Sequence, residues 1–292
     1  MKPITFTRVK RKLIRIFFRE QWSLLLLAGG KDGFLKPSGK NGRILKEIIP
    51  PRDFQWADPF IVEWEGKTYI FVEQQYKHEN GTLGFIELFT DLSHSAFVPI
   101  LEKFYHLSFP NIFRYENEWY MIPESHENRT IDLYKAKDFP ATWEFETTLM
   151  RDIDAVDSIV FFHNTKWWIF TSVKRKSFND NLCLFYADAF PTDKWTPHLC
   201  NPVCADVTNS RMAGAIFCDD SGKIYRAAQN CLKDYGKETN INEIIELTET
   251  SYKERIVKTI FPEKEMNVVC THTLNFSENH VVRDVKTRVW RI

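Results

Sequence analysis

The feature of this sequence that most constrains its fold is a strand–turn–strand phrase that recurs along the chain. Residues 58–73 read DPFIVEWEGKTYIFVE and residues 109–124 read FPNIFRYENEWYMIPE, and both end on a carboxylate. The same pattern returns at residues 156–172 and 211–229, and more weakly at residues 271–284. Two apolar runs joined by a short polar turn are typical of a β-hairpin. The chain is therefore predicted to repeat one hairpin unit.

The spacing of these phrases indicates how the hairpins are assembled. The aromatic residues of the second strands, Tyr69, Tyr120, Trp168 and Tyr225, follow one another at intervals of 51, 48 and 57 residues. A further apolar strand tends to follow each hairpin, and repeats of about 50 residues with three or four strands are typical of propeller blades. Aromatic residues make up 15% of the chain, which favours β structure or a sugar-binding surface. The five phrases predict an all-β fold, a five-bladed β-propeller.

The predicted domain organisation is one propeller with a short basic extension. No Gly/Ser/Pro-rich linker divides the chain, so residues 21–292 are predicted to form a single domain, preceded by an N-terminal extension over residues 1–20 for which a helix is one expectation. Seven of these twenty residues are Lys or Arg. The apolar run at residues 24–28 is too short to span a membrane, and the order of a secretory signal is missing. We therefore expect a cytoplasmic protein, and two placements of the extension stay open: on the anionic inner face of the membrane, or as a surface helix packed on the domain.

Polar residues gather where the predicted first strand of each blade begins. Because these strands line the central channel of a propeller, side chains at their starts converge on one pocket at one rim. The residues concerned are Asp58, Asn111, Asp157, Arg211 and His272, and the hairpin ends add Glu73, Glu124 and Gln229.

This set of side chains suits chemistry at a glycosidic bond. Such chemistry needs one carboxylic acid to protonate the leaving oxygen and a carboxylate that acts as nucleophile or activates water. A third acid can orient a water or shift the pKa of a neighbour, and an arginine can hold a carboxylate or phosphate of the substrate. Structural roles stay open beside these: Asp58 precedes a proline and could start a turn, Arg211 could form a salt bridge, and His272 could lie in the core.

Several other classes of protein are excluded or unsupported by the sequence. The formal net charge of zero argues against a general nucleic-acid binder. The motifs of serine hydrolases, P-loop and dinucleotide-binding proteins and zinc proteases are missing. Cys200 and Cys204 lack a second Cys/His pair nearby that would complete a zinc site. No metal ligands and no cofactor are predicted, and a divalent metal in the channel is left open without a motif to support it.

The phrases together resemble a known family. WADPFIVEWEGKTYIFVE, SFPNIFRYENEWYMIPE, VDSIVFF, SRMAGAIFCDDSGKIYRAAQNC with YGKETNINEI, and THTLN occur in the order found in the N-terminal domain of plant glucosamine inositolphosphorylceramide transferase and its bacterial relatives. The resemblance covers roughly residues 20–290.

That family is in turn similar to the five-bladed propellers of glycoside hydrolase families 43, 32, 68 and 130. Those enzymes place three acids from successive blades in the central pocket. The resemblance implies Asp58 as the acid of the first blade, and the other two among Glu124, Asp157 and their neighbours. The chain departs from the pattern at the opening of the second blade, where Phe109, Pro110 and Asn111 stand in place of the Asp of many family 43 enzymes.

We therefore interpret the chain as a carbohydrate-active enzyme of glycosyl transfer in the synthesis of a cell-surface polysaccharide or glycolipid. Asp58 is predicted as nucleophile or base, Glu124 as general acid and Asp157 as orienting acid. The predicted substrate-binding residues are Glu73, Asn111, Arg211, Gln229 and His272. The expected partners are a glycan, a sugar nucleotide or a sugar phosphate, with peripheral membrane contact through residues 1–20 and no nucleic acid. Two alternatives stay open: a family 43-like glycoside hydrolase, and a non-catalytic glycan-binding or docking propeller.

Overall fold

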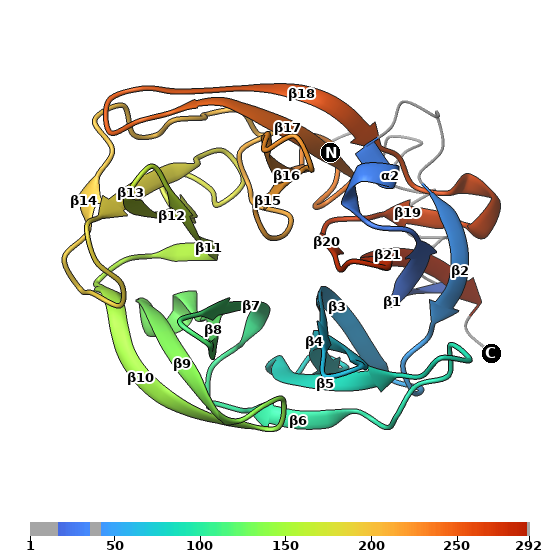
Figure 1. The fold of residues 1–292 in the computed structure, drawn as a ribbon. Helices are drawn as coiled ribbons and strands as arrows, with labels where there is room; N and C mark the ends of the chain where they lie inside the picture. The colour runs from blue at the N-terminus through green and yellow to red at the C-terminus, as the bar shows by residue number, and fades with distance from the viewer. Residues whose placement is uncertain (1–16, 36–41, 291–292) are drawn as a thin grey trace, which may run out of the picture.

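The computed structural model describes residues 17–35 and 42–290, which form five antiparallel β-sheets arranged around a central axis (Figure 1). Each sheet is one blade, with its first strand nearest the axis and its last strand at the periphery. The prediction of an all-β, five-bladed propeller is confirmed.

Four blades follow one another along the chain, each with its strands in sequence order. The first blade contains β3 (Phe54–Trp64), β4 (Lys67–Tyr76), β5 (Thr82–Leu88) and β6 (Val98–Leu101). The second contains β7 (Ser108–Tyr115), β8 (Glu118–Glu124), β9 (Thr130–Asp138) and β10 (Thr142–Arg151). The third contains β11 (Ala155–His163), β12 (Lys166–Val173), β13 (Cys183–Ala187) and β14 (Thr196–Pro197). The fourth contains β15 (Phe217–Cys218), β16 (Ile224–Asn230), β17 (Glu238–Leu247) and β18 (Tyr252–Ile260).

The polar turns of the repeated phrase are two-residue hairpin turns in the first three blades. The turn residues are Glu65-Gly66, Glu116-Asn117 and Asn164-Thr165, and all of them have a positive φ. Turns with positive φ at both central positions match the right-handed twist of the strands that they join. These turns place the starts of β3, β7 and β11 and the ends of β4, β8 and β12 at the same face of the propeller, which we call the pocket face.

The fifth blade is assembled from both ends of the chain. It contains β19 (Val268–Cys270), β20 (Leu274–Phe276) and β21 (His280–Trp290) together with β1 (Phe18–Ala28) and β2 (Arg43–Ile48). β1 pairs with β21 over its whole length, from Phe18 opposite Trp290 to Ala28 opposite His280. The apolar run at residues 24–27 is completely buried in this pairing. It is therefore a central strand that closes the ring.

The pairing of β1 with β21 places part of the predicted N-terminal extension inside the propeller. The boundary predicted after residue 20 falls inside β1, because that strand begins at Phe18. Residues 1–16, which carry most of the predicted basic extension, lie outside the described residues. The helices are short: α2 (Lys31–Leu35), η1 (His126–Asn128) and η2 (Lys264–Met266). Within residues 17–35 and 42–290, every helix is too short or too polar to cross a bilayer.

The core lies between neighbouring blades and is rich in aromatic rings. Phe71, Phe109 and Phe170 are completely buried in one cluster that joins the first four blades. Phe109 meets Phe60 of the first blade edge to face, with ring centroids 5.1 Å apart. Burying one such ring stabilises a fold by roughly 1.5–3 kcal/mol. Rigid packing between the blades holds the inner strands, and hence the pocket face, in place.

A buried ion pair in the fourth blade supports the loop that leads to Arg211. The Arg226 guanidinium is fully buried and donates two hydrogen bonds of 2.5 Å to the Glu254 carboxylate. It also donates to the backbone carbonyl of Asn209, at 2.7 Å. Changing Arg226 to Met is expected to lower the free energy of unfolding by about 3–5 kcal/mol, because it leaves the Glu254 charge without its partner. Denaturant unfolding measures this loss.

The matched control is Lys253→Met. Lys253 pairs with Glu246 at 2.5 Å on the surface of the same blade. Exposed pairs contribute only about 0–1 kcal/mol, so this variant should unfold close to the native chain. An Arg226→Met variant that is no less stable than Lys253→Met would contradict the structural role given to the buried pair.

Candidate active site

A cavity of about 280 Å³ lies at the propeller axis on the pocket face. Its walls come from the starts of inner strands, the ends of their hairpin partners and the loops between blades. The lining residues are Trp22, Gln55, Ala57, Asp58, Glu73, Gln75, His106, Ser108, Glu124, His126, Val156, Phe178, Arg211, Tyr235 and His272. The cavity thus combines three carboxylates, one arginine and three histidines with several aromatic rings.

A β-bulge at the start of the inner strand sets the orientation of Asp58 in the first blade and of Asp157 in the third. The register between β3 and β4 shifts between Ala57 and Phe60, and that between β11 and β12 shifts between Val156 and Ile159. Inside these shifts, Asp58 and Asp157 adopt the left-handed conformation, with φ of 51° and 54°. Non-glycine residues are uncommon there, and such strain gathers at functional sites.

The second blade has the same bulge with a different residue. The register between β7 and β8 shifts between Ser108 and Asn111, and Phe109 sits inside it with φ of 46°. Phe109 is therefore the structural counterpart of Asp58 and Asp157, but its ring is fully buried against the first blade. The position at which many family 43 enzymes carry an Asp is therefore occupied here by a buried aromatic ring, and the second blade supplies no acid from it.

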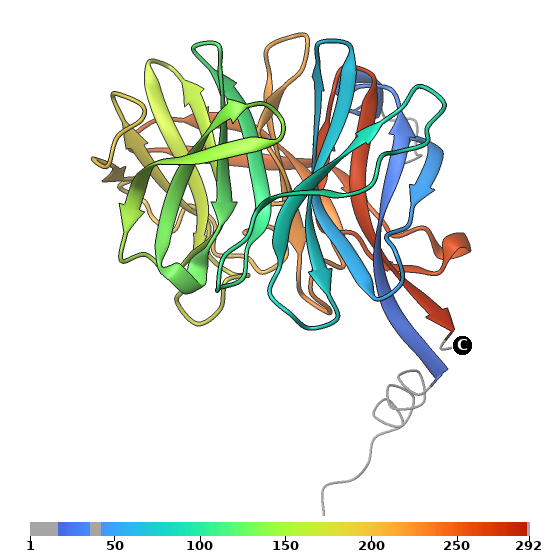
Figure 2. The same cartoon turned by 90° about the horizontal axis from the view of Figure 1, so that it is seen from below.

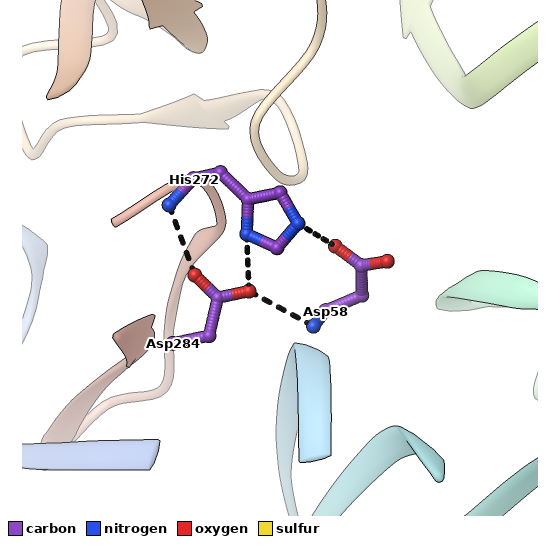
Figure 3. A group of neighbouring side chains, drawn as sticks. All are labelled: Asp58, His272 and Asp284. Carbon is purple, nitrogen blue, oxygen red and sulfur yellow. Dashed lines mark hydrogen bonds and ion pairs between the residues drawn. The ribbon is translucent and has the colours of Figure 1, made fainter. Parts of the chain in front are cut away.

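Asp58 belongs to a cluster that joins the fifth blade to the first (Figure 3). His272 Nδ1 lies 2.6 Å from Asp284 Oδ2, and His272 Nε2 lies 3.5 Å from Asp58 Oδ1. The Thr273 hydroxyl donates to Asp58 Oδ1 at 2.6 Å. The second oxygen of Asp58 points away from the imidazole. One Asp58 oxygen is therefore held by the cluster, and the other points away from it.

Asp284 is the buried anchor of this cluster. Its side chain is completely buried and accepts backbone N–H bonds from Asp58, His272 and Thr273, at 3.0, 2.9 and 3.0 Å. Burial raises the pKa of Asp284, but the attraction of His272 and these hydrogen bonds outweigh burial and lower it. Burial lowers the pKa of His272, while Asp284 and Asp58 raise it above its usual value. The two carboxyl groups therefore favour the protonated form of His272.

The same cluster is the one group among the described residues with the spacing of metal ligands. One donor atom each from Asp58, His272 and Asp284 lies within 4.8 Å of the others. However, both oxygens of Asp284 are already occupied by N–H groups, which leaves Asp58 and His272 as available ligands. A catalytic zinc site normally has three protein ligands. The donor set suits a hydrogen-bonded cluster better than a metal centre.

Glu73 lies on β4, opposite Ala57 of β3, and is partly buried at the cavity wall. Burial raises the pKa of Glu73 well above its usual value, and the charges of Asp58 and Glu124 raise it further. Its one ion-pair contact is with His106, whose Nε2 lies 3.4 Å from Glu73 Oε1. His106 Nδ1 accepts the backbone N–H of Gly81 at 3.0 Å, so a neutral His106 carries its proton on Nε2, toward Glu73.

The pKa of Glu124 is shifted in the opposite direction to that of Glu73. The Ser108 hydroxyl donates to Oε2 at 2.6 Å, and Oε1 accepts the backbone N–H of His126 at 3.0 Å with the imidazole Nδ1 2.7 Å away. Burial raises the pKa of Glu124, but these hydrogen bonds outweigh it and lower the pKa below its usual value. The bond to Glu124 in turn raises the pKa of His126. Glu124 is thus ionised at neutral pH, which does not suit the general-acid role predicted for it.

Asp157 lies behind Arg211. Arg211 Nε donates to Asp157 Oδ2 at 2.6 Å, and Gln229 Nε2 donates to the same oxygen at 3.3 Å. Burial raises the pKa of Asp157 to about 6, although Arg211 opposes the shift. The guanidinium also lies 4.9 Å from the centre of the Tyr235 ring. Arg211 lines the cavity and Asp157 does not, so Asp157 positions the Arg211 guanidinium at the cavity wall.

The structure brings most of the predicted residues together. Asp58, Glu73, Glu124, Arg211 and His272 line the cavity, and Asp157 and Gln229 lie directly behind its wall. Asn111 is placed elsewhere: its side chain is buried and donates to the backbone carbonyl of Ser158 at 3.3 Å, bridging the second and third blades. Asn275 bridges the fifth and first blades in the same way, through the Pro59 carbonyl at 2.7 Å.

Several functional candidates were missed by the sequence interpretation. They are Trp22, His106, His126, Phe178, Tyr235 and Asp284. One of them, Asp284, could have been found from the repeat. It follows His280 by four residues, just as Glu73 follows Tyr69 and Glu124 follows Tyr120. The others lie in loops, in η1 or in β1, where the repeat gives no guide.

Solved structures with the same architecture are all remote in sequence. A family 117 glycoside hydrolase of the marine bacterium Zobellia galactanivorans superimposes with a TM-score of 0.56 at 10% identity, covering 91% of this chain and 90% of that one. The Bacteroides ovatus protein xyloglucan PUL GH43B superimposes with a TM-score of 0.54 at 11% identity, covering 70% of this chain and 44% of that one. These likenesses establish the fold.

The fold and the site define the class of protein, a five-bladed β-propeller with an acid-lined axial cavity. The particular family follows from sequence: the model of "Glucosamine inositolphosphorylceramide transferase 1, N-terminal" matches residues 45–282, and the chain belongs to this family. The rice protein (Oryza sativa subsp. japonica) named glucosamine inositolphosphorylceramide transferase 1 is 31% identical over 205 residues, covering 68% of this chain. The chain spans 27% of that relative's length.

Proposed function

We propose that this chain is an enzyme that transfers a glycosyl group, with its chemistry in the axial cavity. The observation that carries the proposal is the pair of carboxyl groups whose pKa values are driven apart in one cavity, raised for Glu73 and lowered for Glu124. Environments that separate the pKa values of neighbouring carboxyl groups are how enzymes obtain an acid and a base from the same residue type.

The geometry supports a revised division of roles. Glu73 is proposed as the general acid, because its raised pKa keeps a proton available for the leaving oxygen of the donor. Asp58 is proposed as the base or nucleophile, because it lines the cavity and one of its oxygens points away from the cluster that holds it. Burial raises the pKa of Asp58, and the charge of His272 and the Thr273 hydroxyl favour its ionised form against this shift. Glu124 and His126 are proposed to hold sugar hydroxyls, and Arg211 to hold a phosphate or an acidic sugar.

Transfer is proposed ahead of hydrolysis because the family relative is named a transferase. We propose a sugar nucleotide or sugar phosphate as donor, a glycan or glycolipid as acceptor, and a role in the synthesis of a cell-surface polysaccharide or glycolipid. Cytoplasmic synthesis at the inner face of the membrane, with residues 1–20 on the anionic lipid, fits this proposal. Hydrolysis of a glycan is the second candidate, because an acid beside a carboxylate base is also what hydrolysis requires.

A ligand screen with product analysis tests the proposal. Sugar nucleotides, sugar phosphates and neutral oligosaccharides are each added to the full chain, and thermal unfolding is followed. A ligand at about 100 times its dissociation constant stabilises the fold by about 2.7 kcal/mol, which shifts the melting temperature by a few degrees. We expect a shift with a sugar nucleotide or sugar phosphate, and a new glycoside when donor and acceptor are combined. A shift only with neutral oligosaccharides, with their hydrolysis as the sole product, would replace transfer by the second candidate.

A further inference from the structure

A patch of exposed apolar and basic residues surrounds the end of β21. Trp290, Ile49 and Phe17 expose 63%, 61% and 52% of their surface, which is unusual for large apolar side chains gathered at one end of a blade. Trp290 stands between two shallow hollows and lines both of them. We call this surface the Trp290 patch.

The charges around the Trp290 patch are mostly positive. The two hollows that share Trp290 are lined by four cations, Arg19, Arg52, Lys264 and Arg288, and by one acid, Asp53. Arg52, Lys264 and Arg288 are exposed. Tryptophan together with flanking Lys and Arg is the combination that settles at the interface between lipid headgroups and acyl chains, and cations favour an anionic surface.

The Trp290 patch lies on the same side of the propeller as the cavity. β1 starts and β21 ends there, as Figure 2 shows at its lower right. Trp22, four residues along β1 from Phe18, already lines the cavity, and its backbone N–H donates to Gln55 at the start of β3, at 2.6 Å. A flat surface that contacted the patch would therefore face the side on which the cavity opens.

We propose that the Trp290 patch is a docking surface for an anionic membrane, so that the pocket face is turned toward the lipid. Trp290, Ile49 and Phe17 enter the headgroup region, and Arg19, Arg52, Lys264 and Arg288 contact anionic headgroups. The contact is made by the propeller itself, in addition to any contribution of residues 1–16. It requires no particular reaction in the cavity, so its failure and the failure of the proposed transfer are separate results.

Sedimentation of the full chain with lipid vesicles tests the docking surface. Vesicles of phosphatidylcholine alone are compared with vesicles in which about a third of the lipid is phosphatidylserine. We expect binding to the anionic vesicles only. Each basic residue at an anionic surface contributes roughly a fivefold factor in affinity, so the double variant Ile49→Glu with Arg52→Glu should bind at least about tenfold more weakly.

The matched control carries the same two kinds of change on the opposite face. Phe162, which is 53% exposed near the turn after β11, is changed to Glu together with the exposed Lys194→Glu. This variant should bind as the native chain does, and thermal unfolding should show both variants folded. Equal binding by the double variant and the native chain would overturn the proposal. The proposal would also be overturned if deletion of residues 2–16 abolished binding while the double variant had no effect. It would likewise be overturned if the native chain did not bind anionic vesicles.

Discussion

Replacing Asp58 with Asn is expected to lower turnover by about a thousandfold while the chain stays folded. Asn has nearly the same shape and can keep the hydrogen bond with the Thr273 hydroxyl, so the bulge and the cluster with His272 have little reason to change. What it lacks is the negative charge that a base or nucleophile uses, and a positioned base or acid contributes roughly 10²–10⁴-fold. Product formation from the donor that the ligand screen identifies measures the loss.

The control for this variant is another buried aspartate. Asp132 is 5% exposed, as Asp58 is, and accepts hydrogen bonds from the hydroxyls of Thr130 and Thr148 at 2.9 and 2.8 Å. It lies in β9, away from the cavity lining, so Asp132→Asn should leave turnover within a few-fold of native. If Asp58→Asn turned over as fast as Asp132→Asn, Asp58 would have no part in the chemistry.

Replacing Glu73 with Gln is expected to remove the alkaline fall of the pH–rate profile and to lower turnover by roughly 10²–10⁴-fold. A general acid works only while it is protonated. Because burial raises the pKa of Glu73 well above its usual value, the native enzyme should lose activity only as pH rises through that raised pKa. Gln cannot titrate, so the residual activity of the variant should not show this loss. The measurement is kcat/KM against pH for both proteins.

Glu124→Gln separates the two possible assignments of the acid. The pKa of Glu124 is lowered by its hydrogen bonds with His126 and Ser108, so Glu124 is already ionised wherever the native enzyme is active. Its replacement should weaken substrate binding and keep the alkaline fall. The reverse result, in which Glu124→Gln removes the alkaline fall and Glu73→Gln keeps it, would restore the role predicted for Glu124 from the sequence. Since these carboxyl groups interact, each profile reports the ionisation of the cavity as a whole.

The arrangement of the cavity explains why so many acids can share it. Asp58 and Asp284 flank His272, Glu73 faces His106, Glu124 holds His126, and Asp157 pairs with Arg211. Each carboxyl group thus has a basic neighbour and its own electrostatic environment. Where hydrogen bonds dominate, as at Glu124, the pKa is lowered, and where burial and like charges dominate, as at Glu73, the pKa is raised.

The sequence by itself determined the repeated architecture. A hairpin is a local structure, and its two apolar runs and two-residue turn can be recognised within some 16 residues, as in residues 58–73. Once the repeat is known, the geometry of a propeller requires the starts of its inner strands to converge. That is why Asp58, Arg211 and His272, with the hairpin ends Glu73 and Glu124, were expected close together, and all five line the cavity.

Only the tertiary structure decided how the ring closes and how the acids divide their roles. The pairing of Phe18 with Trp290 joins the two ends of the chain, and no local pattern specifies so distant a partner. Likewise, the sequence gives Glu73 and Glu124 equivalent positions at the ends of two similar hairpins, yet their pKa values shift in opposite directions. Glu124 accepts hydrogen bonds from Ser108 and His126, while Glu73 is partly buried and lies close to the charge of Asp58. The charge state of a buried acid depends on burial and on neighbours brought together by folding, and these are properties of the folded chain.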